Sequence, residues 1–555
     1  MGKTVKFDLS CDRLIGIASD LTEDHNYIGA LKMLNKNSSL HCNDGDSYML
    51  YAEIYDDIGL HEKCVNSWFK FIDCTQNSEL SEAYEGLAVA YMNLGNEHFS
   101  AYYYNKLLQN DEELDAETRG EIINSFLSNE PNPLKFVYPP KIADYSDVMA
   151  AGVEKMRTGE YERAVEEFEK VDEENPAYLS ARNYIAMCDI ICDKCDEAEA
   201  ECLALLEKHP DNVQALTTLA AVRTEQKNSA ESRRLAKELL SLNVTSTDEI
   251  YKIATVCCEN KMHTEAYSLF CRLEDELFYD SSLLYFKAVS AYNSGKFEES
   301  YSAFDRLLTV YPDAVTAQFN YQAARKAQED GEPIEMSYFC RLPKEEREKN
   351  LTMLAAFAKL SRTEAKKLFD LIDVSDSIRW CFDETDGVNS EELQFLASEC
   401  AVKAGLDGIL CDVLLNAFVS DALKVHILTL LGERNEDNSF GVVICNIYKR
   451  VSFRALQLGR SRKRGFISAY ARLVAHFSII EDSYGEEFAL ACERLYNELE
   501  EKQRLSFAAD ADALAAAIYL KSGITETGLG VTRENLCTFF DTTEEKLNRI
   551  IGENL

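Results

Sequence analysis

Three cysteines in the middle of the chain have the residue type and spacing for metal chemistry. Cys188, Cys192 and Cys195 follow the pattern Cys-x3-Cys-x2-Cys, in which three thiolates can hold an iron-sulfur cluster. Enzymes that use this spacing build the site in an α/β barrel, and the sequence supplies no parallel strands. The three positions instead fall inside a helical repeat. We therefore expect reduced thiols packed in a helical core, with no metal.

The other residues capable of catalysis are scattered along the chain. Cys257 and Cys258 are adjacent, so on a helix their side chains diverge by about 100° and cannot jointly face one metal ion. His209 and His263 have no partners at ligand spacing, no serine lies in a nucleophile elbow, and no glycine-rich loop follows a strand. The sequence predicts no catalytic residue, metal or cofactor, and an enzyme is not expected.

One basic segment interrupts a strongly acidic chain. The net charge is −38, from 96 acidic and 58 basic residues, which argues against general nucleic-acid binding because most of the surface would repel phosphates. No acid occurs from Asn438 to Ile480, where the basic patch comprises Lys449, Arg450, Arg454, Arg460, Arg462, Lys463 and Arg464. This patch predicts a site for an acidic partner or for the chain's own acidic repeats. Phosphate binding is the third alternative.

A period of 34 residues in the central chain decides the architecture. Two segments four periods apart align residue by residue: Gly152, Gly159, Tyr161, Ala164, Phe168 and Pro176 correspond to Ala288, Gly295, Phe297, Ser300, Phe304 and Pro312. Small residues let two helices pack closely, a glycine ends the first helix, and a proline closes the unit. The pattern predicts stacked helix hairpins.

This pattern resembles the tetratricopeptide repeat, a helix hairpin of 34 residues. Five units in one frame run from residue 145 to 314, a sixth first helix covers 315–328, and three looser units lie within residues 1–113. The resemblance implies an all-α solenoid, whose concave face in this family holds extended peptides or helices of a partner.

One stripe of each first helix is used for packing, and the neighbouring stripe is expected to line the concave face. On the resemblance, that stripe carries the partner-binding residues Met149, Arg157, Asn183, Met187, Tyr251, Tyr285, Tyr292, Asn293 and Phe319. Methionine and aromatic side chains suit apolar anchors, so binding energy is expected to concentrate in the rings of Tyr251, Tyr285, Tyr292 and Phe319. The alternative is that the C-terminal domain of the chain itself covers this stripe.

Breaks in the repeat set the expected domains. These are three degenerate repeats (1–113), a helix and proline-rich linker (114–144), five repeats with a capping helix (145–331), a helical stack (332–437) and a C-terminal helical domain (438–555). Four prolines between Asn129 and Pro140 exclude a helix there. Residues 440–448 are apolar and β-branched, which predicts a strand pair.

The C-terminal end is similar to a degenerate helix-turn-helix. An alanine-rich helix over 513–521 precedes a short helix, a turn and a final helix. Asp541 stands where the turn usually has glycine, and the final helix opens with Glu544 and Glu545. These acids would repel DNA phosphates, so we expect a retained scaffold without the DNA contact.

No apolar run is long enough to cross a bilayer, and the first residues lack an apolar signal core. We therefore expect a cytoplasmic protein. The leading hypothesis is a protein-interaction scaffold that binds a peptide or protein partner in the concave groove of its repeats. The alternative is a nucleic-acid-associated regulator that uses the C-terminal helical domain, with the repeats as a sensor.

Overall fold

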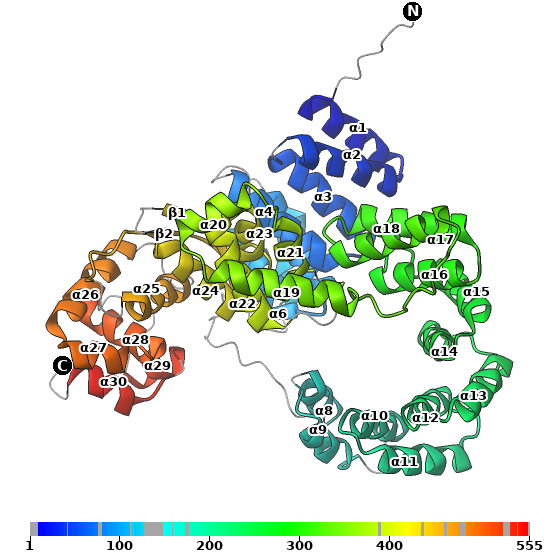
Figure 1. The fold of residues 1–555 in the computed structure, drawn as a ribbon. Coiled ribbons are helices and arrows are strands. Elements are labelled where there is room, and N and C mark those ends of the chain that lie inside the picture. The colour runs from blue at the N-terminus through cyan, green and yellow to red at the C-terminus, as the bar shows by residue number, and fades with distance from the viewer. Residues whose placement is uncertain are drawn as a thin grey trace, which may run out of the picture. The chain divides into compact units, whose positions relative to one another are not determined.

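The computed structural model consists almost entirely of helices (Figure 1). It describes residues 9–41, 43–75, 80–110, 114, 116–126, 148–157, 159–171, 177–383, 385–386, 390–434, 438–459, 463–477, 484–524, 533–540 and 542–552. The chain divides into two compact units, one made of residues 1–140 and 343–555, the other of residues 141–342. Pro176 and the expected linker from Asn129 to Pro140 lie outside the described residues.

The unit of residues 141–342 is a run of consecutive hairpins, which confirms the prediction from the period. Its helices are α8 (Val148–Arg157), α9 (Tyr161–Phe168), α10 (Tyr178–Ile191), α11 (Cys195–Lys208), α12 (Val213–Glu225), α13 (Ser229–Ser241), α14 (Thr247–Glu259), α15 (His263–Leu273), α16 (Ser281–Asn293), α17 (Phe297–Val310) and α18 (Val315–Glu329). Figure 1 shows the first helices of the hairpins, α8 to α16 with even numbers, along the inner side of the curve that this unit makes. We call this the inner face.

One backbone conformation recurs at the turn of every hairpin in this unit. Gly159, Asp193, Lys227, Lys261 and Gly295 stand one period apart, and their φ angles are 79°, 59°, 60°, 54° and 77°. Glycine reaches this left-handed region without strain, whereas other residues have a steric cost there. Three turns therefore keep the geometry without the glycine, and for this reason the sequence pattern is clearest in the first and last units.

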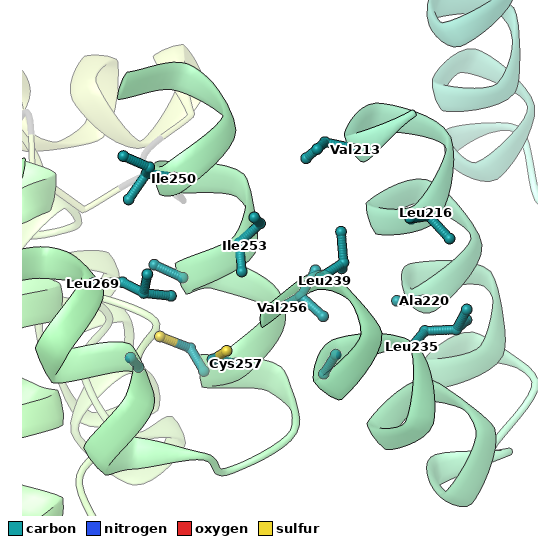
Figure 2. Packing of buried hydrophobic residues seen from close by; sticks show 14 of the residues in the cluster. Val213, Leu216, Ala220, Leu235, Leu239, Ile250, Ile253, Val256, Cys257 and Leu269 are labelled. Carbon is teal, nitrogen blue, oxygen red and sulfur yellow. The ribbon is translucent and has the colours of Figure 1, made fainter. Parts of the chain in front are cut away.

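Small residues at the helix crossings hold the hairpins together. A Cβ built on Gly152 would lie 2.4 Å from Cε1 of Phe168, so α8 and α9 leave no room for a side chain at that point. The equivalent Ala220 and Ala254 are fully buried. They belong to one continuous core contributed by α12 to α15, part of which Figure 2 shows. Each hairpin thus buries its apolar side against the next one.

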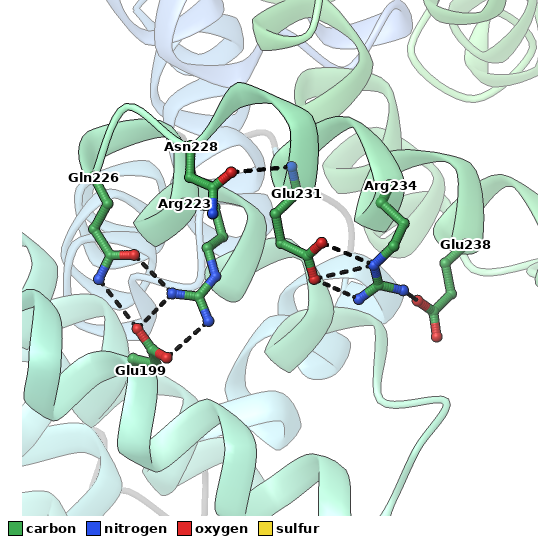
Figure 3. A network of polar contacts seen from close by, with 7 residues as sticks. All are labelled: Glu199, Arg223, Gln226, Asn228, Glu231, Arg234 and Glu238. Atoms are coloured by element: carbon green, nitrogen blue, oxygen red, sulfur yellow. Dashed lines mark hydrogen bonds and ion pairs between the residues drawn. The ribbon is translucent and has the colours of Figure 1, made fainter.

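Ion pairs join neighbouring helices at the surface of this unit (Figure 3). The Arg223 guanidinium on α12 donates to both carboxylate oxygens of Glu199 on α11, at 2.6 and 2.7 Å. On α13, Arg234 pairs with Glu231 and Glu238 of its own helix. Exposed pairs of this kind contribute roughly 0–1 kcal/mol each, so most of the stability comes from the apolar core.

The other unit begins with the three expected hairpins and a further helix. They are α1 (Cys11–Glu23), α2 (Tyr27–Leu40), α3 (Gly45–Asp57), α4 (His61–Thr75), α5 (Ser81–Asn93), α6 (Glu97–Asn110) and α7 (Ala116–Phe126). Gly86 on α5 is another close crossing, because a Cβ there would lie 2.2 Å from Nε1 of Trp68 on α4.

After residue 343 the same unit continues without the 34-residue register. Its elements are α19 (Lys344–Ala358), α20 (Arg362–Phe369), α21 (Ser375–Trp380), α22 (Glu391–Ala404), α23 (Asp407–Leu414), α24 (Asp421–Gly432), β1 (Asn438–Ile444), β2 (Ile447–Phe453), α25 (Lys463–Phe477), α26 (Gly485–Glu498), α27 (Glu501–Phe507), α28 (Ala511–Ser522), α29 (Arg533–Phe539) and α30 (Glu544–Ile551). The strand pair is confirmed as an antiparallel hairpin. Its two turn residues, Cys445 and Asn446, both have positive φ, as tight hairpin turns require.

This strand hairpin contacts the N-terminal repeats. The Tyr103 hydroxyl donates to the Asn446 carbonyl at 2.6 Å, and the Tyr91 hydroxyl donates to Oδ1 of the same asparagine at 3.1 Å. Asp73 at the end of α4 accepts from the hydroxyl of Tyr448 and the guanidinium of Arg450, each at 2.8 Å. The first and last parts of the chain therefore belong to one unit, an arrangement that the sequence order does not suggest.

Candidate functional site

A stretch of extended chain lies on the inner face of the repeats. After α18 ends, residues 332–342 form no helix or strand, and Met336 enters the apolar core of α16 to α18. Tyr338 packs against both this core and that of α12 to α15. We call residues 334–340 the resident segment. It lies against the first helices that were expected to carry partner-binding residues.

Two side chains of α16 bind the backbone of the resident segment. The Asn293 amide donates to the Met336 carbonyl and accepts from the Met336 N–H, both at 2.9 Å. The Tyr285 hydroxyl lies 3.1 Å from the Ser337 carbonyl and 3.4 Å from that of Phe339. Contacts to peptide groups do not depend on the side chains of the bound segment, so these two residues can hold any extended chain.

Alternate side chains of the resident segment face the helices. Met336 is 6% exposed, Tyr338 and Cys340 are half-buried, and Phe339 between them is 73% exposed. Alternation of this kind is the period of an extended strand. The Tyr338 ring stacks on the His263 ring with centroids 5.7 Å apart, and its hydroxyl lies 2.8 Å from Nδ1 of that histidine. Two side-chain contacts thus add selectivity to the backbone contacts.

Charge complementarity fixes the start of the resident segment. Nζ of Lys261, in the turn before α15, lies 2.8 Å from Oε1 of Glu335, and this hydrogen bond lowers the pKa of the Glu335 carboxyl. Nε2 of His263 lies 3.9 Å from the same oxygen. Burial nevertheless lowers the pKa of His263, because it outweighs the opposing effect of Glu335 and Glu265, and Lys261 acts in the same direction as burial. The lowered pKa favours the neutral form of the His263 imidazole, which is the form that contacts the Tyr338 hydroxyl.

The four rings in which binding energy was expected to concentrate differ in burial. Tyr285 and Tyr292 are 3% and 2% exposed, and the Tyr292 hydroxyl donates to the Ala324 carbonyl. Tyr251 is half-buried with its ring edge-on to Phe270, and Phe319 is also half-buried. Tyr285 and Tyr292 belong to the same apolar cluster as Met336, and the Tyr285 hydroxyl contacts the backbone of the resident segment. Within this unit, the resident segment therefore lies against two of the predicted rings.

The predicted residues on α8 and α10 have different surroundings. Met149, Asn183 and Met187 are half-buried, and Arg157 is exposed and paired with Glu154 of its own helix at 2.7 Å. The carbonyl oxygen Oδ1 of Asn183 is buried and has no hydrogen-bond partner among the described residues. Asn183 stands three periods before Tyr285, whose hydroxyl contacts the resident segment. The equivalent position therefore carries a polar side chain on both helices, Asn183 on α10 and Tyr285 on α16.

His263, Lys261, Met336 and Tyr338 were absent from the expected site. A signal for them existed in the sequence, since Ile334, Met336, Tyr338 and Cys340 alternate with other residues directly after Pro333. Alternation over a few residues predicts extended chain, but it does not say which surface that chain covers.

Ion pairs within the unit use much of the basic patch. Arg450 pairs with Asp73 at 2.8 Å, Arg464 with Glu399 at 3.0 Å, and Arg454 with Glu486 at 3.7 Å. Arg460 and Arg462 lie outside the described residues. Lys449 and Lys463 are the remaining two residues of the patch. Of the acids in these pairs, Asp73 lies in the N-terminal repeats, whereas Glu399 and Glu486 lie in α22 and α26.

The Cys188 group has the surroundings of core thiols. Cys188 is fully buried, and burial raises the pKa of its thiol to about 11. Cys192 and Cys195 are half-buried at the turn between α10 and α11. Within the described ranges, no three Cys, His, Asp or Glu side chains are grouped so that they could hold a metal ion. Nor does any helix in those ranges have the length and apolar character to span a membrane.

No family model and no curated protein matches the chain. Similar solved structures include a tetratricopeptide repeat protein from Parabacteroides merdae, with 15% identity, coverage of 51% of this chain and 99% of that one, and a TM-score of 0.24. Yeast Tom70 has 13% identity, coverage of 93% and 97%, and a TM-score of 0.26. A human IFIT1 dimer with PPP-AAAA has 16% identity, coverage of 77% and 94%, and a TM-score of 0.27.

The architecture of the chain itself carries the assignment. A 34-residue period, small residues at the helix crossings and a recurring left-handed turn residue together define the hairpins from α8 to α17. Three further hairpins, α1 to α6, precede them. The chain is an all-α solenoid of helix hairpins, and its 34-residue pattern resembles that of tetratricopeptide repeats.

Proposed function

We propose that this protein is an interaction scaffold whose repeats bind an extended segment of a protein partner on the inner face of α8 to α18. The observation that carries the proposal is the resident segment, which is held by Asn293 and Tyr285 through its backbone. A surface that binds extended chain from its own polypeptide has the donors, acceptors and apolar floor that a partner's segment needs.

The α8 to α12 part of the inner face is the proposed contact for the first part of a partner. Met149 and Met187 are flexible apolar side chains that adapt to an anchor residue. Catalysis has no role in this proposal.

The alternative, a nucleic-acid-associated regulator, has no comparable support. Arg450, Arg454 and Arg464 face carboxylates of the same unit, and α30 begins with the exposed acids Glu544 and Glu545. Asp541, in the expected turn of the helix-turn-helix, lies outside the described residues. A phosphate backbone would have to compete with these acids for the arginines.

A pair of matched variants tests the scaffold proposal. Met187→Glu places a charge on the inner face of α10, and Leu203→Glu places one on α11, where the leucine is 48% exposed. Tagged full-length proteins are used for capture in the native host, with quantification by mass spectrometry. We expect the wild type and Leu203→Glu to retain the same partner. The amount of partner captured should fall at least tenfold with Met187→Glu, and the three proteins should have equal melting temperatures. If Leu203→Glu loses the captured partner and Met187→Glu retains it, the proposal is overturned.

A further inference from the structure

The resident segment is attached to the repeats through one side only. Of residues 331–341, Met336 alone is buried, Tyr338 and Cys340 are half-buried, and the remainder are exposed. Ile334 and Phe339 are large apolar residues at 47% and 73% exposure. Release of the segment would therefore uncover the pockets for Met336 and Tyr338 and leave the helix hairpins, which pack through other residues, in place.

Three features of the pockets define which sequence fits them. The Lys261 ammonium selects an acid, the apolar cluster that contains Tyr285, Val289 and Tyr292 selects an apolar side chain without a branch at Cβ, and the His263 ring selects a tyrosine. Their order along the segment is Glu335, Met336, one exposed residue, and Tyr338. Asn293 fixes the register, because it bonds both backbone groups of the residue in the apolar pocket.

We propose that this part of the inner face, formed by α14, α16 and the turn before α15, recognises a partner segment of the form acid, Met or Leu, any residue, Tyr, and that the resident segment holds the site closed until such a partner displaces it. The proposal rests on the proposed function and names the partner class and its regulation. A basic residue in place of the acid would face the Lys261 ammonium and be repelled.

The tether makes displacement a competition. The resident segment follows α18 after a few residues, and a short flexible linker gives an effective concentration on the order of millimolar. A partner sees an affinity reduced by the fraction of molecules in which the site is open. If the resident segment is closed in about nine molecules of ten, emptying the site raises the apparent affinity about tenfold.

The test offers a labelled synthetic peptide that copies residues 332–341, with serine in place of Cys340, to the full-length protein. The site is emptied by the double variant Met336→Gly and Tyr338→Ala, which changes the resident segment and leaves both pockets intact. Phe339→Ala is the matched control, because this exposed ring makes no use of the pockets. Fluorescence anisotropy gives each Kd. We expect the emptied variant to bind at least tenfold more tightly than the wild type, and Phe339→Ala to bind like the wild type.

A second variant guards against misfolding of the first. Glu335→Lys keeps both buried side chains but loses the pair with Lys261, so its affinity for the peptide should lie between those of the wild type and the emptied variant. A peptide with lysine at the Glu335 position should bind the emptied variant about two- to fivefold more weakly, because an exposed ion pair contributes little to affinity. Equal affinity of all four proteins, or no binding to either opened variant, would overturn this inference. Partner capture that depends on Met187 would survive that result, so the two proposals fail separately.

Discussion

Replacement of Asn293 by alanine should release the resident segment without unfolding the repeats. The side-chain amide makes two hydrogen bonds to the backbone of Met336, both at 2.9 Å. A typical intramolecular hydrogen bond contributes about 0.5–1.5 kcal/mol net, so the pair contributes about 1–3 kcal/mol to the closed state. Because each 1.4 kcal/mol is tenfold in an equilibrium constant, the equilibrium constant for opening should rise about 5- to 150-fold.

Hydrogen exchange measured by mass spectrometry on the peptide that spans residues 332–342 reports this opening, since the Met336 N–H is an Asn293 partner. Ser294→Ala is the control. It removes the neighbouring hydroxyl, whose oxygen is buried without a hydrogen-bond partner among the described residues, and exchange should stay at the wild-type rate. If the peptide exchanges at the wild-type rate in both Asn293→Ala and Ser294→Ala, the Asn293 hydrogen bonds do not hold the segment and the reasoning is refuted.

Three further outcomes are expected. Gly465→Ala should lower the melting temperature, because its Cβ would lie 2.3 Å from the Ala508 carbonyl oxygen and overpacking costs about 1–3 kcal/mol, whereas Gly408→Ala, with open space around it, should not. The protection factors of the resident segment, which correct exchange for the slower intrinsic amide rate at lower pH, should decrease as pH falls below about 6.5. The reason is that the lowered pKa of His263 means that closure favours its neutral form; protection factors independent of pH would contradict this. On heparin at roughly 0.15 M ionic strength, the protein should flow through, because its net charge is −38 and Arg450, Arg454 and Arg464 pair with carboxylates of the same unit.

The repeat was predictable because its determinants are local. Gly152 and Ala288 mark helix crossings, and Gly159 and Gly295 mark turns, each from residue type and spacing alone. The strand pair was also predictable, since residues 440–448 combine β-branched and apolar side chains. The short helix α21 was missed, because six residues give too little periodicity for recognition.

The site was only partly predictable, because its other half comes from elsewhere in the sequence. The stripe on α16 shares one helix face, as its spacing predicts, but Tyr285 lies against a segment more than fifty residues later, and nothing near the tyrosine encodes that contact. The same holds for the basic patch, since Asp73, which pairs with Arg450, is 377 residues away in sequence. Spacing within one helix indicates which residues share a face, but it does not indicate which other segment packs on that face.

The contact between the strand hairpin and the N-terminal repeats gives an order to biosynthesis. Tyr103 and its acceptor Asn446 are 343 residues apart, and at roughly 5–20 residues per second a ribosome needs roughly 20–70 s to travel between them. During that interval residues 141–342 emerge complete, with all their hairpins able to close in sequence. The first 140 residues wait with their tyrosine hydroxyls unmatched. A nascent chain stalled before residue 438 should therefore carry a protease-resistant middle and a protease-sensitive beginning.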